Sequence, residues 1–333
     1  LIEKGSILGG LATSGLINWF EPLCDSKGHQ ILSSMVEELF NLSIKYGYKT
    51  YNENWKESKE RKATWFDHNL FALSLNRLLK ENNVDIYYET TFISSNVTNK
   101  NITSIRCFNV EGEFEIIAKT YIDASGNAVL ARSANLETRS GVNYLTYVTT
   151  TYKDGLNKPL MQYTGSGLDG KGHPKGLKTF NGLIQDDVNE YLSLSQEYCL
   201  KQYEKGIMKD ISSLPNMPQF RKIASIVGEY TLDTNDEHKH QYDSIGLIPV
   251  FNKPGQLYEI PLRCLYSNKI SNLYFAGRII SSINEAWEAT RVIPVSILTG
   301  EVTGIISYLK INNMFSYEKL KEILLSRNIK INF

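Results

Sequence analysis

The sequence predicts an α/β fold in which helices cover a mostly parallel sheet, and two stretches carry this prediction. Residues 272–276 form an almost uninterrupted apolar run, which is typical of a parallel strand buried on both faces. Gly277 ends this strand, and Pro294 then fits the first turn of a helix whose apolar residues recur at helical spacing. Residues 119–131 repeat the order of hydrophobic strand, glycine turn and helix.

The helix at Pro294 begins without a neighbouring side chain that could accept hydrogen bonds from its first backbone N–H groups. Ile293 stands just before the proline, and its side chain cannot accept a hydrogen bond from the first turn as Ser, Thr, Asp or Asn would. Either water or an oxygen of a bound ligand is expected there, and the sequence does not decide between them. Gly300 and Gly304 lie on one face and predict a close approach to another backbone or to a cofactor.

Composition limits the function classes. A chain of 333 residues normally divides into two domains. The 36 Lys and Arg balance the 36 Asp and Glu, which argues against nucleic-acid binding. The four cysteines are far apart, so neither a zinc site nor a disulfide framework is indicated, and reduced cytoplasmic thiols are the simplest interpretation. No apolar run is long enough to predict a membrane span.

The first part of the chain alternates helices and strands. Residues 31–44 predict an amphipathic helix, and residues 46–62 predict polar surface structure. Asp67 is the expected N-cap of a second helix, which is followed by a strand at 84–88 that returns the chain to the parallel sheet. Residues 97–117 alternate short β-rich runs with turns and predict an antiparallel meander.

The composition of the sequence changes between about 143 and 256, where Tyr- and Thr-rich β segments surround a predicted helix at 186–205. We interpret this part as a second domain that covers the substrate. Its glycine-rich loop at 165–176 lacks the GK[ST] ending of a phosphate-binding loop, so a surface turn is expected. His238 and His240 lie in a charged loop and are interpreted as surface residues, so no metal site is predicted.

The string LYFAGRIISSINEAWEATRVIPVSILTGEVTGI, which includes the strand and the helix at Pro294, resembles the C-terminal FAD-binding segment of the FAD-dependent oxidoreductases. Asn284 stands where that family usually has His, and Glu288 where it usually has Gly. The opening LIEKGSILGGLATSGL resembles the family's segment with the ribose-binding acid, which would be Glu3, and IDASG at 122–126 resembles a third. The resemblance implies FAD contacts at Glu3, Lys4, Gly9, Gly10, Ala12, Thr13, Phe92, Ile93, Ala124, Ser125, Gly126, Gly277, Arg278, Glu285, Val292 and Pro294.

A fourth segment, FRKIASIVGEYTL at 220–232, resembles part of the family's substrate domain, although Ala224 and Ser225 stand where two arginines are usual. Arg221, Arg263 and Arg291 are the candidate catalytic residues, because guanidinium groups bind carboxylates with two hydrogen bonds. The resemblance implies hydride transfer between flavin and a small, anionic organic substrate. Two alternatives stay open: a non-catalytic fragment unable to bind FAD alone, and a nucleotide-binding module without redox turnover.

The resemblance also implies the domain plan. We expect a Rossmann-like FAD/NAD(P)-binding domain from 1–140, with the meander at 92–118, and from 257–333, and an inserted α+β substrate domain at 141–256. The family's GxGxxG turn would lie roughly 20 residues before Glu3 and is not in the sequence. We therefore expect an N-terminally truncated FAD domain that does not retain FAD by itself, with a βα segment as the partner that completes it.

Overall fold

The computed structural model describes residues 1–47, 63–152, 159–163, 173–208 and 210–333. At its centre, β6 (Tyr121–Asp123) and β14 (Leu273–Phe275) pair in parallel, with Leu273 opposite Tyr121 and Phe275 opposite Asp123. All three residues of β14 are buried. The predicted buried parallel strand is therefore confirmed, and the neighbour it pairs with is the other strand that the sequence indicated.

The N-terminal segment makes a second parallel contact. Ile2 forms a parallel bridge with Tyr87, supported by hydrogen bonds from the N–H of Glu3 to the carbonyl of Tyr87 (2.9 Å) and from the N–H of Tyr87 to the carbonyl of Leu1 (2.8 Å). The strand predicted at 84–88 is reduced to this bridge. The helix that leads to it, α2 (His68–Glu81), is capped as predicted by Asp67, whose Oδ1 accepts from the N–H groups of Asn69 and Leu70.

The helix α1 (Met35–Lys45) begins later than the predicted residue 31. The reason is that Ile31 and Leu32 donate their N–H groups to the carbonyl of Leu23 and so belong to a buried irregular segment. A short helix, α5 (Asn284–Thr290), lies where the sequence indicated a loop. It leads directly into α6 (Ile293–Ile311), which has proline in its first turn as predicted. Helix α3 (Val129–Ser133) follows β6, and α7 (Tyr317–Ser326) follows α6.

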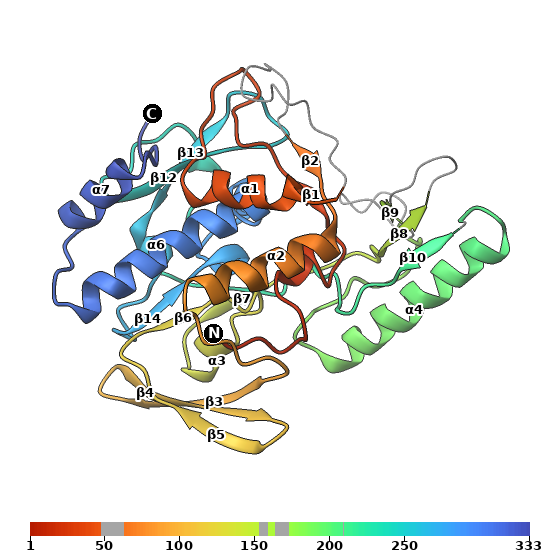
Figure 1. Ribbon diagram of the computed structural model, residues 1–333, viewed down its shortest axis with the longest axis horizontal. Helices are drawn as coiled ribbons and strands as arrows, with labels where there is room; N and C mark the ends of the chain where they lie inside the picture. The colour runs from red at the N-terminus through yellow and green to blue at the C-terminus, as the bar shows by residue number, and fades with distance from the viewer. Residues whose placement is uncertain (48–62, 153–158, 164–172, 209) are drawn as a thin grey trace.

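The prediction for Gly300 and Gly304 is wrong in one part: no described backbone approaches either glycine, while the approach to a cofactor stays a prediction. A Cβ atom added at either position would meet no described atom within 4 Å, so this face of α6 makes no close backbone approach. The opposite side of the helix is buried, and Val295, Leu298, Val302 and Ile306 are at most 1% exposed. In Figure 1, α6 lies beside α1 and α2 on one side of the central strands.

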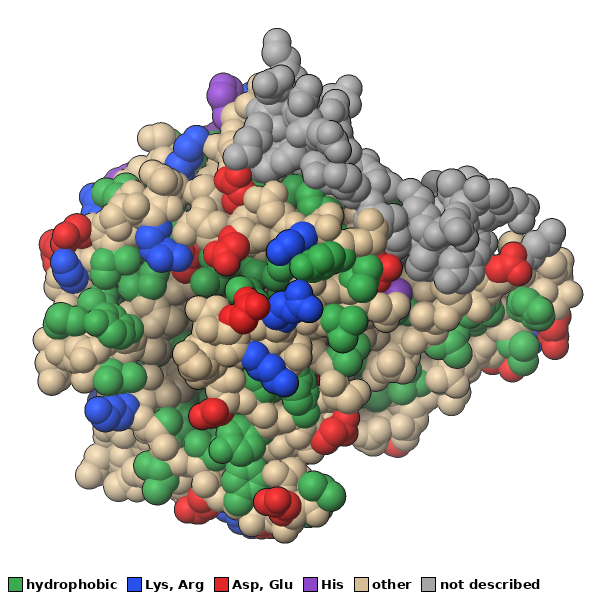
Figure 2. Space-filling model, in the orientation of Figure 1, with side chains coloured by type: hydrophobic (Ala, Val, Ile, Leu, Met, Phe, Trp, Pro, Cys, Tyr) green, Lys and Arg blue, Asp and Glu red, His purple; other side chains and the backbone are tan. Residues whose placement is uncertain are grey.

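The predicted meander is confirmed as an antiparallel sheet of β3 (Thr91–Thr98), β4 (Asn101–Asn109) and β5 (Gly112–Ile116). It lies at the lower edge of the molecule in Figure 1. In Figure 2, hydrophobic side chains show on its surface, and acidic and basic side chains are interspersed across the upper face, consistent with the balanced net charge.

The segment at 141–256 contains α4 (Gln185–Glu204), close to the predicted helix, and contributes strands to two small antiparallel sheets. One pairs β7 (Thr138–Ser140) with β11 (Ala224–Ile226). The other orders β10 (Ile211–Ser213), β8 (Val148–Tyr152) and β9 (Pro159–Tyr163). Most of the predicted surface segment at 46–62 and of the glycine-rich loop at 165–176 lies outside the described residues.

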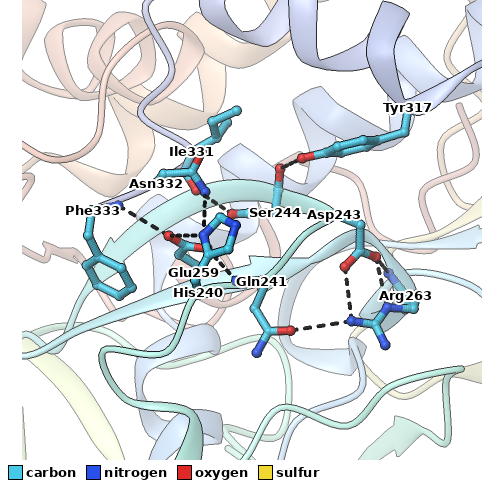
Figure 3. A network of polar contacts seen from close by, with 10 residues as sticks. All are labelled: His240, Gln241, Asp243, Ser244, Glu259, Arg263, Tyr317, Ile331, Asn332 and Phe333. Carbon is cyan, nitrogen blue, oxygen red and sulfur yellow. Dashed lines mark hydrogen bonds and ion pairs between the residues drawn. The ribbon is translucent and has the colours of Figure 1, made fainter.

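The remaining strands form two antiparallel pairs. The pair β1 (Trp19–Phe20) and β2 (Thr64–Trp65) joins segments before α1 and α2. The pair β12 (Ser244–Pro249) and β13 (Leu257–Pro261) packs beside α6 and α7 (Figure 1). In Figure 3, residues 331–333 lie along this pair, with the N–H of Phe333 donating to Glu259 (3.2 Å) and the Ser244 hydroxyl donating to the carbonyl of Ile331.

All four cysteines are buried thiols. Within the described ranges no single helix is long and apolar enough to cross a membrane, and α5 with α6 satisfies the length and composition only as a pair bent by 80°. The same ranges contain no group of three or more His, Cys, Asp or Glu side chains that could hold a metal ion.

Glu301 generates a stability prediction, because its side chain on α6 is buried and joins three elements. It accepts hydrogen bonds from the Ser34 hydroxyl (2.7 Å), the Met35 N–H (3.3 Å) and Arg327 (2.5 Å). Glu301→Ala should lower the free energy of unfolding by about 2–3 kcal/mol, because it leaves the start of α1 and Arg327 without their acceptor. In the matched control Glu322→Ala, loss of the exposed pair with Lys319 should cost under about 1 kcal/mol in the same urea titration. Equal losses would contradict the prediction.

Candidate functional site

The site begins where β14 ends. Gly277 has a φ of 76° and turns the chain so that Arg278 points into the protein. The Arg278 guanidinium donates to the carbonyls of Phe220 and Arg221, the latter at 3.1 Å. Burial, reinforced by the charge of Arg291, lowers the pKa of Arg278 to about 10. A partly buried cation held by carbonyl oxygens is poised to attract a negatively charged group.

Arg278 lies directly against the turn that follows β6. A Cβ atom at Gly126 would lie 2.7 Å from Nε of Arg278, so any other residue at this position would require the guanidinium to shift. The neighbouring Asp123 carboxylate is buried and accepts from the N–H of Ser125 (3.0 Å), from its hydroxyl, and from the N–H groups of Leu130 and Ala131. Asp123 therefore fixes the predicted cofactor turn at 124–126.

The predicted N-terminal loop is compact. Gly9 and Gly10 have φ angles of 103° and 52°, and the buried Thr13 hydroxyl donates to the carbonyl of Leu8. A Cβ atom at Gly9 would lie 2.6 Å from Cγ2 of Thr13. Glu3, the predicted ribose acid, accepts from the N–H of Gly5 through Oε1 (2.8 Å), which orients its carboxylate at the end of the Ile2 segment.

The N-terminus of α6 has an acceptor that the sequence did not reveal. The N-cap residue is Val292, which supplies no side-chain hydrogen bond, and the Glu21 carboxylate accepts from the backbone of Ile293 instead. Burial raises the pKa of Glu21 to about 7, although hydrogen bonds from the backbone of Glu21 and Ile293 and the charge of Arg291 oppose the shift. Its Oε2 is inaccessible to solvent and has no hydrogen-bond partner. The sequence signal that could have revealed Glu21 is its single charge inside the run LINWFEPLC at 16–24.

Two further cations lie around Trp287, which is 4% exposed. Nζ of Lys222 is 4.8 Å from the centre of its ring, and the guanidinium carbon of Arg291 is 5.5 Å from it. Glu288 accepts from Nε of Arg291 at 2.8 Å and lies 2.7 Å from its Nη2. Burial lowers the pKa of Lys222, against the raising effect of Glu288, and Arg139 lowers it further. Sequence reasoning missed Lys222 and Trp287.

Two predicted residues have contacts of a different kind. Arg263 donates to Asp243 through Nε and Nη2, both at 3.1 Å (Figure 3). Its guanidinium also lies over the rings of Tyr230 and Tyr242. Glu285 is half-exposed and forms an ion pair with Lys253 at 2.6 Å. Arg221 thus meets Arg278 through its carbonyl, Arg291 acts on Arg278 through its charge, and Arg263 has a network of its own. The predicted catalytic roles of all three candidates stay predictions.

The other predicted cofactor positions divide by burial. Ala12, Val292 and Pro294 are buried, the latter two at the start of α6. In β3, Phe92 packs against the core and Ile93 is 42% exposed. Lys4 and Ala124 are exposed. The Ser125 hydroxyl oxygen accepts a hydrogen bond from the N–H of Val129, the first residue of α3.

A sequence model of the family described as FAD dependent oxidoreductase matches residues 1–164 and 193–327. The chain belongs to this family. Its members are enzymes whose cofactor is FAD, so the resemblance drawn from the sequence motifs is confirmed together with the Rossmann-like fold class.

Comparison with solved structures gives remote likenesses to this FAD dependent oxidoreductase. The p-nitrophenol 4-monooxygenase PnpA from Pseudomonas putida DLL-E4 has 10% identity and a TM-score of 0.45, over 96% of this chain and 75% of PnpA. PqsL from Pseudomonas aeruginosa, a probable FAD-dependent monooxygenase, has 11% identity and a TM-score of 0.42, over 98% of this chain and 84% of PqsL.

A third likeness is to CabE, an aromatic hydroxylase from angucycline biosynthesis, with 9% identity, a TM-score of 0.34 and 62% of this chain covered. The match spans 47% of CabE, about half its length. A search of curated proteins finds no match. Likenesses of this size identify neither the substrate nor the reaction of this FAD dependent oxidoreductase.

The residues present fit FAD in three respects. The backbone at Gly10 leaves room for a close ligand approach, because no described atom lies within 4 Å of a Cβ placed there, while Thr13 and Arg278 fill the space beside Gly9 and Gly126. The first turn of α6 supplies N–H donors without a side-chain cap from its own N-cap residue. The Arg278 guanidinium adds positive charge beside them, which suits a cofactor that becomes more negative on reduction.

Gly126 gives a prediction with a close control. Gly126→Ala places a Cβ at a φ of 74° and against Arg278, whereas Gly112→Ala places one at a φ of 110° with no atom within 4 Å. Both should show the cost of the left-handed backbone, about 1 kcal/mol. Gly126→Ala should lose at least about 1–2 kcal/mol more, because the Arg278 contacts must shift. Equal free energies of unfolding in urea would show that Arg278 does not require the glycine.

Proposed function

We propose that this FAD dependent oxidoreductase transfers a hydride between a small, anionic organic substrate and FAD. The observation that carries the proposal is the concentration of Arg278, Lys222 and Arg291 around the turn that joins β14, α5 and α6. FAD, when bound, supplies the hydride chemistry. The chain's own residues bind, orient and neutralise the charged groups.

In this proposal Arg291 and Arg221 hold the substrate's negative group. Arg291 is largely buried at the end of α5, so a carboxylate beside it would be shielded from water and held more strongly than at the surface. Glu288 already pairs with Arg291, and an incoming carboxylate must share or replace that partner. Lys222 offers a second cation on the same indole ring. The four buried thiols favour action in a reducing compartment such as the cytoplasm.

The kinetic prediction compares arginines. Arg291→Ala and Arg221→Ala should each lower kcat/KM for an anionic substrate about tenfold or more, because a charge-assisted contact is worth about 1.5–3 kcal/mol. Flavin content should be unchanged. The control Arg77→Ala removes an exposed arginine of α2 and should leave the kinetics as they are. Unaltered kinetics in both test variants would remove these arginines from the substrate site.

A second prediction concerns Glu3, which we propose accepts hydrogen bonds from the adenosine ribose. Glu3→Gln keeps an oxygen for the N–H of Gly5 but loses the negative charge. FAD binding, followed by flavin fluorescence, should weaken about fivefold or more, consistent with about 1 kcal/mol or more for a hydrogen bond to a charged group. Glu111→Gln, in the exposed β4–β5 turn, is the control. The same affinity in all three chains would contradict the role of Glu3.

The alternative, a chain that does not bind FAD alone, is favoured by one specific observation. Among the described residues, β6 has β14 as its only strand neighbour, and Ile2 pairs only with Tyr87. Ile122 is 40% exposed on β6, and Gly300 and Gly304 leave one face of α6 open. We propose that a βα segment is the partner that adds a strand to these edges, because unpaired edges recruit strands.

This partner has a direct test. Supplying a βα segment of roughly 30 residues with a GxGxxG turn should strengthen FAD binding by the chain. Bleaching of the bound flavin by a substrate or a reductant then separates an oxidoreductase from a module that binds without redox turnover. Strong FAD binding by the chain alone, unchanged by the segment, would refute the need for this partner.

A further inference from the structure

The Glu21 carboxylate lies at the start of α6. Glu21 follows β1, and its Oε2 lies inside the protein near the first turn of a helix of 19 residues. The backbones of Glu21 and Ile293 donate hydrogen bonds to the carboxylate, while Oε2 is buried and has no hydrogen-bond partner among the described residues. A carboxylate that is buried with half of its acceptor capacity unused is costly unless it takes a proton or gains a donor.

We propose that Glu21 is coupled to flavin binding through a proton. Its carboxylate lies at the α6 N-terminus and takes up a proton when an oxygen of the bound flavin approaches the same N–H groups. This inference rests on the proposed function in one respect: the flavin is the ligand. It assigns to Glu21 a role that the sequence resemblance did not imply.

The start of α6 has too few N–H donors to serve both an ionised Glu21 and a flavin oxygen. The N–H of Ile293 is shared between the carboxylate and any incoming oxygen, and two acceptors that face each other without a proton repel. A neutral carboxylic acid removes the repulsion, because its O–H donates to the incoming oxygen while its other oxygen still accepts. The proton comes from solvent, and no other bond changes.

The charges around Glu21 determine whether FAD binding takes up or releases a proton. Arg291, at the end of α5, attracts the ionised form, and the α6 N-terminus does so too. Glu288 is bonded to Arg291 from its exposed side and offsets part of that attraction. A flavin oxygen at the helix end would occupy the N–H donors that now stabilise ionised Glu21. The protonated form of Glu21 would therefore become the more stable one. Binding should therefore be strongest at low pH.

The main test titrates FAD into the parent chain, Glu21→Gln and Glu288→Gln between pH 6 and 9, with flavin fluorescence as the readout. The Kd of the parent should rise by up to tenfold for each pH unit above about 7, as one coupled proton requires. Gln is neutral and keeps a donor and an acceptor, so Glu21→Gln should show no such rise. Glu288→Gln changes the other partner of Arg291 and should keep it.

Calorimetry of the parent in two buffers with different ionisation enthalpies should show proton uptake on FAD binding at pH 8. This measurement needs no variant, so it stands even where Glu21→Gln does not fold. A parent Kd that is independent of pH, or zero proton uptake, would overturn the role of Glu21 while the proposed FAD chemistry stands. Failure of FAD to bind to all three chains at pH 6, and again with the βα segment added, would overturn the proposed function and this inference together.

A measurement without flavin checks the resting state. Because the folded-state pKa of Glu21 is raised from 4.5 to about 7, the folded chain binds the proton more tightly than the unfolded chain. The parent should therefore lose stability relative to Glu21→Gln as the pH rises from about 4.5 through 7, seen as a falling urea midpoint. Parallel pH profiles for the two chains would show that Glu21 is not held as the structure indicates and would overturn the inference.

Discussion

The arrangement of the site depends on the contacts of the partly buried Arg278 guanidinium. It lies against the turn at Gly126, donates to the carbonyls of Phe220 and Arg221, and is repelled by the charge of Arg291. These interactions connect the end of the β6 strand, residues 220–221 and the α5–α6 corner. A desolvated cation tolerates little displacement, because every donor that loses its acceptor carries a desolvation cost. The positions of three distant segments are thereby fixed to one side chain.

The parts of the fold that were predictable are those encoded locally. The β14 strand, the proline start of α6, the Asp67 cap and the meander each follow from a few adjacent residues, and the structure confirms them. The start of α1 was missed because it depends on hydrogen bonds from Ile31 and Leu32 to Leu23, which no periodicity contains. Glu21 was missed for the same reason: its partner Ile293 is far away in sequence and adjacent only after folding.

The two residues that depart from the family's pattern have structural roles of their own. Asn284 begins α5 with a φ of 53°, a conformation that asparagine tolerates better than most residues, and its amide donates to Asp233 at 2.7 Å. Glu288 supplies the carboxylate that pairs with Arg291. Both departures stabilise the corner at which the site is built.

Trp287 has an optical consequence. Its indole lies beside Lys222 and Arg291, whereas Trp19 and Trp65 pack against each other with ring centres 4.8 Å apart. Fixed positive charges near an indole shift its emission, so the fluorescence of Trp287 should differ in wavelength from that of the tilted Trp19–Trp65 pair. Any anion that binds near those cations changes the local field, and the protein thus contains its own spectroscopic probe of site occupancy.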